Sequence, residues 1–292
     1  MSESLPWHKP VITRLMQLLQ ADQLPNAIAL TCAPGWGHEQ LLAEASMALL
    51  ENTDQRVIEE FAHPDFRWVV PDGAVIKIDQ VRRINEFAVQ TPQIAPRKVA
   101  AISDAHLLNP NSANALLKTL EEPPPNTHII LATPYWGKLL PTIRSRCQRF
   151  QVAPDIDQAR NWLETEGISL SDMEFAEVGY APLTARAAVA LNSVDLTLWL
   201  TALAPDSMAA SVEQVLDTEV VLWLGRWYRR LLMHLQAQPI PNCTASPQAL
   251  IGFADDLLNA RRQIETSNAA NVRLHLEELI VRWLQLQRSS RA

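Results

Sequence analysis

Hydrophobic positions in the first half of the chain alternate between two periods. Apolar residues recur at helical spacing over Val11 to Gln20 and over Gln40 to Leu50, and a short apolar run, residues 27–33, lies between these segments. Three further apolar and partly β-branched runs predict buried strands, at residues 66–70, 99–103 and 128–133. Strands that alternate with helices predict a parallel sheet flanked by helices, because parallel neighbours need crossover connections.

The pattern changes near Ala153. Beyond this point strand signals nearly disappear, and apolar residues recur every three or four positions in three sets: Ala159, Trp162 and Leu163; Val220, Leu224, Trp227, Leu231 and Leu235; Val272, Leu276, Leu279, Trp283 and Leu286. Residues 236–248 contain three prolines and no charge, and they predict a loop between two long helices.

The predicted fold is therefore an α/β core with a parallel sheet, followed only by helices. A softer break near Asn192 to Asp195 divides the helical half. We predict an α/β domain over residues 1–153, a small helical domain over 154–192 and an all-helical C-terminal domain over 193–292.

Composition excludes several classes of protein. The 292 residues carry a formal charge of -7, so any contact with nucleic acid must be local rather than a bulk attraction. No apolar stretch approaches the roughly 18 residues of a bilayer span, and MSESLPWHKP lacks a signal-peptide pattern. The three cysteines, Cys32, Cys147 and Cys243, stand far apart, which argues against a disulfide framework or a zinc knuckle. We expect a soluble cytoplasmic protein without a membrane partner.

The loop after the first predicted strand stands where a phosphate-binding loop would. The pattern G-x-x-x-x-G-K-[ST] holds phosphates with backbone N–H groups, a lysine and a magnesium-binding hydroxyl. Gly35 and Gly37 are present, but the lysine position is His38 and the hydroxyl position is Glu39. An imidazole is largely neutral at pH 7, and a carboxylate repels the anion that the loop would attract.

The acidic pair expected after the strand at residues 99–103 is altered as well. A magnesium-binding Asp followed by a catalytic Glu would stand there, whereas the sequence has Ser103 and then Asp104. We favour a tight strand-to-helix turn without nucleotide chemistry. Nucleotide binding without hydrolysis and intact nucleotide chemistry are the alternatives.

Three arginines, Arg144, Arg146 and Arg149, lie close together in TIRSRCQRF, residues 142–150. Residues 123–154 contain no Asp or Glu, so these arginines and Lys138 give the segment a local charge of +4. The segregation indicates either a solvated basic face or a contact with an anionic partner.

Two segments carry a family resemblance: NSANALLKTLEEPPPNTHIILAT, residues 111–133, and LLPTIRSRCQRF, residues 139–150. Together they resemble the AAA+ core of bacterial DNA polymerase III clamp-loader subunits, over roughly residues 5–192. The altered phosphate loop is similar to that of the delta-prime branch rather than to that of the ATPase members gamma and tau. The family's four-cysteine zinc module is absent, because residues 51–65 contain no cysteine, and we expect no metal.

The resemblance implies roles for individual residues. Ser145, Arg146 and Cys147 match the family's Ser-Arg-Cys motif, whose arginine enters the ATP site of the adjacent subunit as an arginine finger. Thr133 matches the sensor 1 position and Arg186 the sensor 2 arginine, and neither is expected to act in a pocket that has lost its chemistry. A nucleophilic role for Cys147 lacks an identifiable histidine and acid partner.

The resemblance implies a non-catalytic structural subunit that donates Arg146 to a neighbouring ATPase subunit and has no cofactor, with ATP binding by this chain not expected. The implied partners are the gamma or tau and delta subunits, other replicase subunits and, through the assembled complex, primer-template DNA and the sliding clamp. The alternative is an active AAA+ ATPase of DNA replication or repair with a divergent phosphate loop. DNA binding by the chain alone is a weaker third hypothesis, since its other positive charges are scattered.

Several remaining residues have simpler interpretations. Glu121 and Glu122 end a predicted helix before three prolines and are expected to be solvated. His106 and His128 are expected to be ordinary packed or surface residues, because neither has a second metal ligand at helical spacing. The tryptophans, Trp199, Trp223 and Trp227 among them, are expected mainly in the core. Arg144 and Arg149 stay open between solvation, an interface and intrachain pairing.

Overall fold

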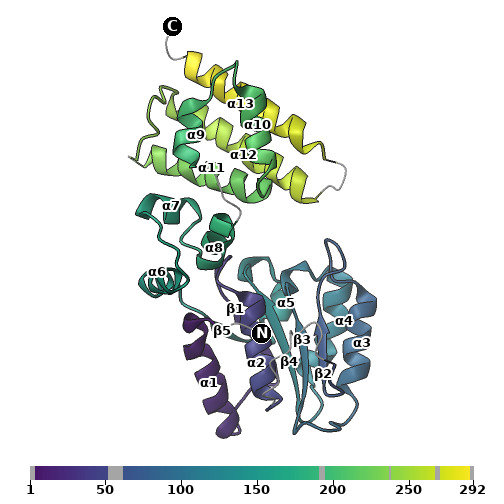
Figure 1. Cartoon of the computed structure of the whole chain (residues 1–292). Helices are drawn as coiled ribbons and strands as arrows, with labels where there is room; N and C mark the ends of the chain where they lie inside the picture. Colours follow the sequence, from purple (N-terminus) through teal and green to yellow (C-terminus); the bar gives the residue numbers. More distant parts are fainter. Residues whose placement is uncertain (1–3, 52–61, 191–194, 237, 267–269, 290–292) are drawn as a thin grey trace. The chain divides into compact units, whose positions relative to one another are not determined.

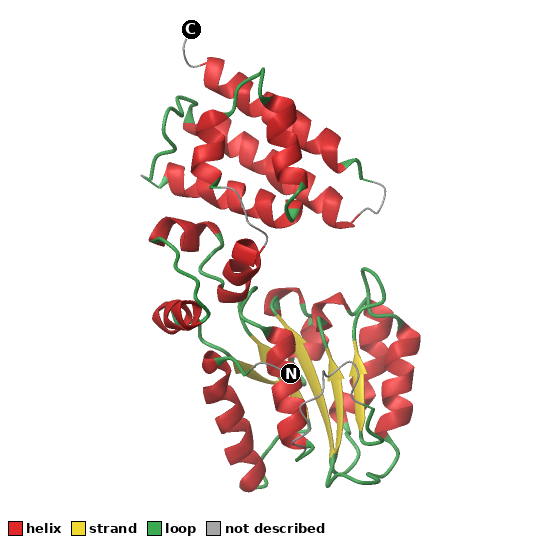
Figure 2. Ribbon diagram, viewed as in Figure 1, coloured by secondary structure: helices red, strands yellow, loops and turns green. Residues whose placement is uncertain are grey.

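The computed structural model describes residues 4–51, 62–190, 195–236, 238–266 and 270–289 (Figure 1). The chain forms two compact units, residues 1–162 and 163–292. The first unit contains the strands, and the described part of the second is built of helices and loops (Figure 2). Residues 51–65, which lack the cysteines of a zinc module, are described only at 51 and 62–65.

Five parallel strands form the sheet of the first unit, in the spatial order β2-β3-β4-β1-β5. Their bounds are β1 Ala27–Thr31, β2 Phe66–Val69, β3 Lys98–Ile102, β4 Thr127–Thr133 and β5 Gln148–Gln151. The first four strands confirm the predicted apolar runs to within two residues. β1, β3 and β4 are buried along their whole length, which explains why they have continuous apolar runs rather than alternation.

The fifth strand was not predicted. β5 pairs with β1 at the edge of the sheet, and Phe150 is its one buried residue. An edge strand whose side chains mostly face water needs no apolar run, and its sequence, QRFQ, therefore has no strand signature. The basic segment, interpreted only as a source of charge, thus also supplies an element of the sheet.

Helices lie against the two faces of this sheet (Figure 1). α3 and α4 lie side by side, and Ile84 and Leu116 on these helices form one cluster with Ile129 and Leu131 of β4. Because side chains alternate along a strand, Ile130 lies on the opposite face, where α2 packs on β4. The bounds are α1 Lys9–Gln20, α2 His38–Leu49, α3 Ile78–Ala88, α4 Pro110–Glu121 and α5 Pro141–Arg144, with short 3-10 helices η1 Pro6–His8, η3 Ala105–Leu107 and η4 Trp136–Lys138.

The described part of the second unit is helical, as predicted. α6 Ile156–Thr165 leads into it, followed by α7 Asp172–Glu177, α8 Pro182–Ala190, α9 Leu196–Ala202, α10 Met208–Leu216, α11 Val220–Leu235, α12 Pro247–Thr266 and α13 Val272–Ser289. The periodic sets at 220–235 and 272–286 are confirmed as α11 and α13. The predicted proline-containing loop lies between α11 and α12, apart from residue 237, which is outside the described residues.

Aromatic side chains form the centre of the second unit. Trp199, Trp223 and Trp227 are each at most 3% exposed, and edge-to-face contacts join Trp227 to Trp199, Phe253 and Trp283. Large buried rings in this arrangement contribute packing beyond their buried area. The tryptophans of the second unit are therefore core residues, as expected. Among the described helices, none combines the length and hydropathy that crossing a bilayer requires.

The three-domain division remains a prediction. The boundary between the two compact units falls after Trp162, inside α6, so α7 and α8 belong to the same unit as the helices that follow. The break predicted near Asn192 lies in residues 191–194, outside the described part of the chain, and the next residue, Asp195, caps α9 by accepting from Leu198 N.

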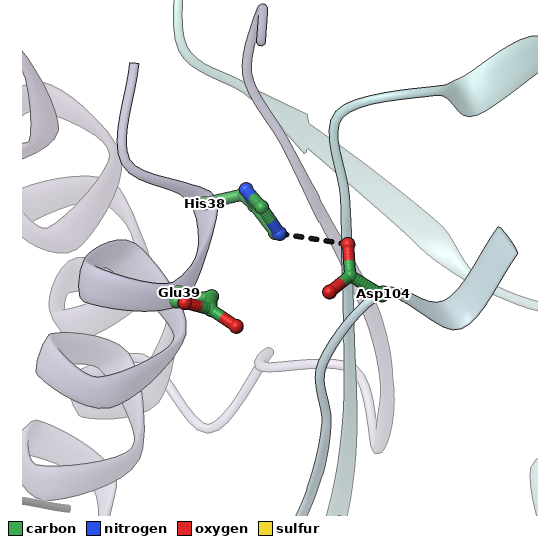
Figure 3. Close-up of side chains that lie close together, drawn as sticks. All are labelled: His38, Glu39 and Asp104. Atoms are coloured by element: carbon green, nitrogen blue, oxygen red, sulfur yellow. Dashed lines mark hydrogen bonds and ion pairs between the residues drawn. The ribbon is translucent and has the colours of Figure 1, made fainter. Parts of the chain in front are cut away.

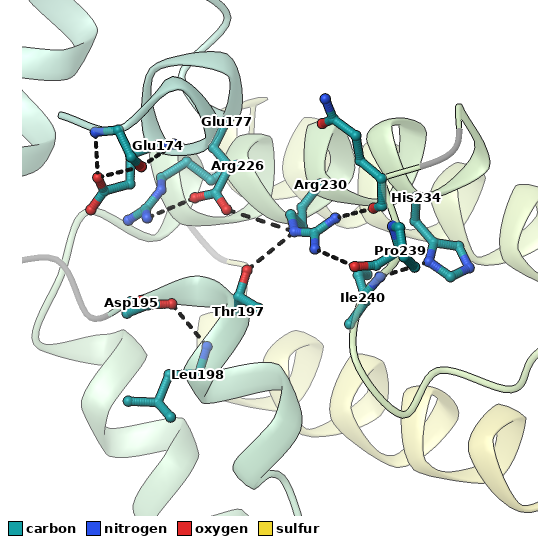
Figure 4. Close-up of polar contacts among 12 residues, drawn as sticks. Glu174, Glu177, Asp195, Thr197, Leu198, Arg226, Arg230, His234, Pro239 and Ile240 are labelled. Carbon is teal, nitrogen blue, oxygen red and sulfur yellow. Dashed lines mark hydrogen bonds and ion pairs between the residues drawn. The ribbon is translucent and has the colours of Figure 1, made fainter.

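A buried ion-pair network ties α7 to α11 (Figure 4). Arg226 Nη2 donates to Glu177 Oε2 at 2.9 Å, and Arg230 Nε lies 3.9 Å from Glu177 Oε1. Each of the three side chains is at most 6% exposed. Burial raises the pKa of Glu177, and the opposing effect of the two arginines does not cancel it. Arg230 also donates to the carbonyl oxygens of Gln238 and Pro239.

We predict that Glu177→Gln lowers the free energy of unfolding of the second unit by about 3–5 kcal/mol, because it removes the carboxylate that pairs with two buried guanidinium groups. Glu265→Gln is the matched control, since Glu265 forms a partly exposed pair with Arg261 on one helix and should cost less than about 1 kcal/mol. Denaturant unfolding of the full chain, followed by tryptophan fluorescence, measures both. Equal losses would contradict the structural role of the network.

Candidate functional site

The loop between β1 and α2 is shaped by two glycines in left-handed backbone conformations. Gly35 has φ of 76° and Gly37 has φ of 82°, a region that side chains disfavour. A Cβ atom on Gly37 would also lie 2.6 Å from Leu5 Cδ1. Gly37 is therefore needed twice, for its backbone angle and for the close approach of the N-terminal segment.

The N-terminal segment holds this loop from one side. Trp36 is buried, and its carbonyl oxygen accepts a hydrogen bond from Trp7 Nε1 at 2.9 Å. His8 is fully buried, and its Nε2 lies 2.9 Å from the same oxygen. The Trp7 ring makes edge-to-face contacts with Trp36 and Trp162, both at 5.3 Å. The loop is thus a tight strand-to-helix turn packed on an aromatic cluster.

Side chains at the lysine and hydroxyl positions of the phosphate-loop pattern form hydrogen bonds with those at the positions of the acidic pair. Figure 3 shows the first of these contacts, between His38 and Asp104. His38, the first residue of α2, has Nε2 2.9 Å from Asp104 Oδ1. Ser103, directly after β3, donates from Oγ to Glu39 Oε1 at 3.1 Å. The structure therefore brings together all four residues that the sequence had singled out at these positions. Asp104 has φ of 46°, which aspartate tolerates better than most residues.

The charges of this group are set by burial and by the imidazoles. Burial alone would raise the pKa of Asp104, but its hydrogen bond with His38 and the nearby His38 and His106 bring that pKa below its ordinary value. Burial lowers the pKa of His106, and the opposing attraction of Asp104 does not reverse this. At neutral pH Asp104 is therefore ionised and the His106 imidazole is neutral.

His106 is a residue whose place the sequence analysis missed. Its Nδ1 lies 3.1 Å from Thr133 Oγ1, at the sensor 1 position, and 3.9 Å from Asp104 Oδ1. Its ring also meets Tyr135 edge-to-face at 5.0 Å. One sequence signal could have placed His106 near Thr133. His106 follows shortly after β3 and Thr133 ends β4, and the carboxyl ends of neighbouring parallel strands meet at one edge of the sheet.

Arg186, at the sensor 2 position, belongs to the other unit. It lies on α8, and its Nη1 is 3.7 Å from Glu166 Oε2. His128, expected as a packed or surface residue, is buried in β4, with Nδ1 3.2 Å from the Pro25 carbonyl oxygen. Thr133 thus lies in the same unit as the phosphate loop, and Arg186 lies in the second unit.

Arg146 lies between α5 and β5, and its guanidinium group has contacts on three sides. Its Nε and Nη2 both contact Glu121 Oε1, while Nη1 donates to Thr142 O at 2.9 Å and to Ser145 Oγ at 3.3 Å. Glu121 is exposed at the end of α4, as expected, and the structure adds that it pairs with Arg146. Both side chains remain partly exposed, Arg146 at 31% and Glu121 at 47%.

The other two arginines of the basic segment contact one aromatic ring. The guanidinium carbon of Arg149 lies 4.8 Å from the centre of the Trp136 ring, and that of Arg144 lies 5.9 Å from it. Arg149 Nε also donates to Thr31 Oγ1 at 3.0 Å. Solvation, an interface and intrachain pairing were left open for Arg144 and Arg149, and the structure shows intrachain contacts for both. Arg146 differs from them because its partner is a carboxylate rather than an aromatic ring.

Cys147 has the environment of an inert thiol. It is partly buried, and burial raises its pKa to about 12, so the thiolate that a nucleophile needs is scarce at neutral pH. Cys32 is likewise buried, with its pKa raised to about 12. The Ser145-Arg146-Cys147 triplet thus offers a cation rather than a nucleophile.

The sequence of this chain is similar to those of known proteins. A family model described as "DNA polymerase III, delta subunit" matches residues 7–155, just over half of the chain. The DNA polymerase III subunit delta' of Escherichia coli strain K12 is 29% identical, over 95% of this chain and 94% of that protein. The subunit delta' of Haemophilus influenzae is 33% identical over 57% of this chain and 54% of that protein.

A solved structure shares the fold. The gamma subunit-related protein of Thermotoga maritima, described as a DNA polymerase III protein, superposes with a TM-score of 0.58 at 20% identity, and the match covers 94% of this chain and 99% of that one. At this identity the likeness concerns the fold alone.

We predict that Gly37→Ala lowers the free energy of unfolding of the first unit by about 2–5 kcal/mol, since alanine meets both an unfavourable φ and the Leu5 side chain. Gly73→Ala is the control: Gly73 also has a positive φ, but nothing lies within 4 Å of its added Cβ, so about 1–2 kcal/mol is expected. Chemical denaturation of the two variants separates backbone strain from packing. A loss no larger at Gly37 than at Gly73 would show that Leu5 does not press on the loop.

Proposed function

Because this chain belongs to the DNA polymerase III delta subunit family, we propose that it is a delta-prime subunit of a bacterial clamp loader and that it donates Arg146 to the ATP site of a neighbouring ATPase subunit. The observation that carries the proposal is the contrast between two sites of the first unit. The chain's own phosphate loop is closed by its own side chains, whereas Arg146 keeps part of its guanidinium side chain at the surface.

The contacts of the phosphate loop support a subunit that does not hydrolyse ATP. At the lysine position, His38 forms a hydrogen bond with Asp104. At the hydroxyl position, Glu39 accepts a hydrogen bond from Ser103. A triphosphate would have to break both contacts and approach two carboxylates. These carboxylates would repel the triphosphate, and no lysine stands at this position to offset the repulsion.

The chemistry of Arg146 suits a role in trans. A planar guanidinium stays charged at every working pH and donates bidentate hydrogen bonds to phosphate oxygens. Negative charge on the transferred phosphoryl group is what such a residue stabilises. Arg146 forms hydrogen bonds with Thr142 and Ser145 of its own segment and with Glu121 at the end of α4. To reach a neighbouring subunit, its side chain would exchange Glu121 for an anionic group of that subunit.

The proposed partners follow from this role. Gamma or tau ATPase subunits would receive the arginine, and the delta subunit and other replicase subunits would complete the assembly. The helices of residues 193–292 would pack with equivalent helices of those subunits as a collar. Contact with primer-template DNA and the sliding clamp would arise in the assembled complex, because the chain itself is acidic.

We predict that Arg146→Ala leaves assembly intact and lowers ATP hydrolysis at the site that this chain completes by about 10³-fold or more. The chain is reconstituted with the ATPase and delta subunits of the same organism, and steady-state hydrolysis is measured with clamp and primed DNA present. The total rate should fall by the share of that one site.

Arg144→Ala is the matched control, because Arg144 lies two residues away and contacts Trp136 rather than Glu121. Size-exclusion chromatography confirms that both variants assemble. Full activity of the Arg146→Ala complex would remove the finger assignment. Hydrolysis of ATP by the isolated wild-type chain would instead favour the alternative, an active ATPase with a divergent phosphate loop.

We further predict that Glu121→Gln raises hydrolysis in the reconstituted complex by up to about fivefold. That factor corresponds to about 1 kcal/mol, the upper range for a partly exposed ion pair that must open before Arg146 reaches its neighbour. Glu122→Gln controls for the loss of one negative charge at the same helix end. A lower rate with Glu121→Gln would mean that Glu121 positions the arginine productively.

A further inference from the structure

Three potential metal ligands converge beside the phosphate loop (Figure 3). One ligand atom each from His38, Glu39 and Asp104 lies within 4.8 Å of the other two. His38 and Glu39 begin α2, and Asp104 follows the carboxyl end of β3. The parallel sheet brings these segments to one edge, although His38 and Asp104 are 66 positions apart in the chain.

The spacing of the donor atoms fits one shared ion. Two ligands at about 2.0–2.2 Å from a metal are about 2.9 Å apart at a right angle and about 3.4 Å apart in a tetrahedron. His38 Nε2 and Asp104 Oδ1 are 2.9 Å apart. A carboxylate oxygen of Glu39 lies within 4.8 Å of a ligand atom of each of these two residues.

The surroundings of the carboxylates match those of an outer shell. Ser103, which is buried, donates to Glu39 Oε1, and this leaves the second oxygen of that carboxylate for an ion. The largely buried His106 lies 3.9 Å from Asp104 Oδ1. Neighbours of this kind orient ligating side chains in metal sites. The side chains of His38 and Asp104 are 20% and 24% exposed, so water can reach the open coordination positions.

The charges favour a dication. The site has two carboxylates and a single imidazole, and the lysine that would neutralise the carboxylates in a phosphate loop is absent. The start of α2 contributes a positive end worth about half an elementary charge, which the two carboxylates outweigh. One nitrogen and two oxygen donors suit a first-row transition ion better than magnesium or calcium, which prefer oxygen ligands alone.

We propose that His38, Glu39 and Asp104 bind one divalent first-row ion of the Zn²⁺ and Mn²⁺ class, with water completing the coordination. The ion links the start of α2 to the turn after β3 and replaces the direct contact between His38 and Asp104. It stands where the phosphate-loop pattern places its lysine and hydroxyl. This site is independent of the proposed role of Arg146.

The test is a titration of the full, untagged chain with Mn²⁺, after treatment with a chelator. Free Mn²⁺ is followed by electron paramagnetic resonance, and Mn²⁺ is chosen because thiolates bind it poorly, so the three cysteines contribute little. We expect one saturable equivalent, displaced by Zn²⁺, and a metal-dependent rise in melting temperature. His38→Gln, Glu39→Gln and Asp104→Asn should each weaken binding by about 10-fold to 100-fold or more.

His275→Gln is the matched control, because His275 lies 3.9 Å from Glu278 in a surface pair on α13 and offers a nearby imidazole and carboxylate without a third ligand. It should leave the affinity unchanged. Circular dichroism verifies that each variant is folded. Absence of saturable binding up to about 1 mM Mn²⁺, or unchanged binding in a folded variant that carries all three substitutions, would overturn the proposal.

Discussion

The contact between His38 and Asp104 is the interaction on which the candidate site of the first unit depends. It joins the first residue of α2 to the turn after β3, and a second hydrogen bond joins Glu39, the residue after His38, to Ser103, the residue before Asp104. On the other side of the same loop, Leu5, Trp7 and His8 pack against Gly37 and Trp36. A loop that phosphate-binding proteins keep open for a ligand is here held closed by the protein itself.

In this chain the architecture of a phosphate-binding site is kept, but the side chains at that site bind one another. The parallel sheet and its helices still place Thr133, Asp104 and the start of α2 at one edge, but the groups that would hold a phosphate now satisfy one another. The exposed cation proposed to act on a neighbour lies beside β5, where Arg146 is held by a single carboxylate and two local oxygen atoms. An ion pair that is about one-third to one-half exposed is a weak restraint, and it suits a side chain that must change partners.

Sequence patterns predicted the parts of the fold that burial dictates. β1, β3 and β4 are buried throughout, so each has an apolar run, and α11 and α13 have one apolar face each at helical spacing. β5 was missed because an edge strand with one buried residue has no such run. The pairing of Arg146 with Glu121 and the position of His106 depend on which helix ends and strand ends the sheet brings together, and local periodicity carries no information about them.

The buried carboxylate of α7 has a consequence for how this chain can diverge over time. Glu177 serves both Arg226 and Arg230, and Arg226 has two further nitrogen atoms, Nε and Nη1, that are buried without a hydrogen-bonding partner. Loss of the acid alone removes the carboxylate that pairs with both buried guanidinium groups, and loss of one arginine alone changes the charge balance for the other. Positions 177, 226 and 230 should therefore be inherited as a set, with descendants retaining all three residues or exchanging them together for apolar ones of matching volume.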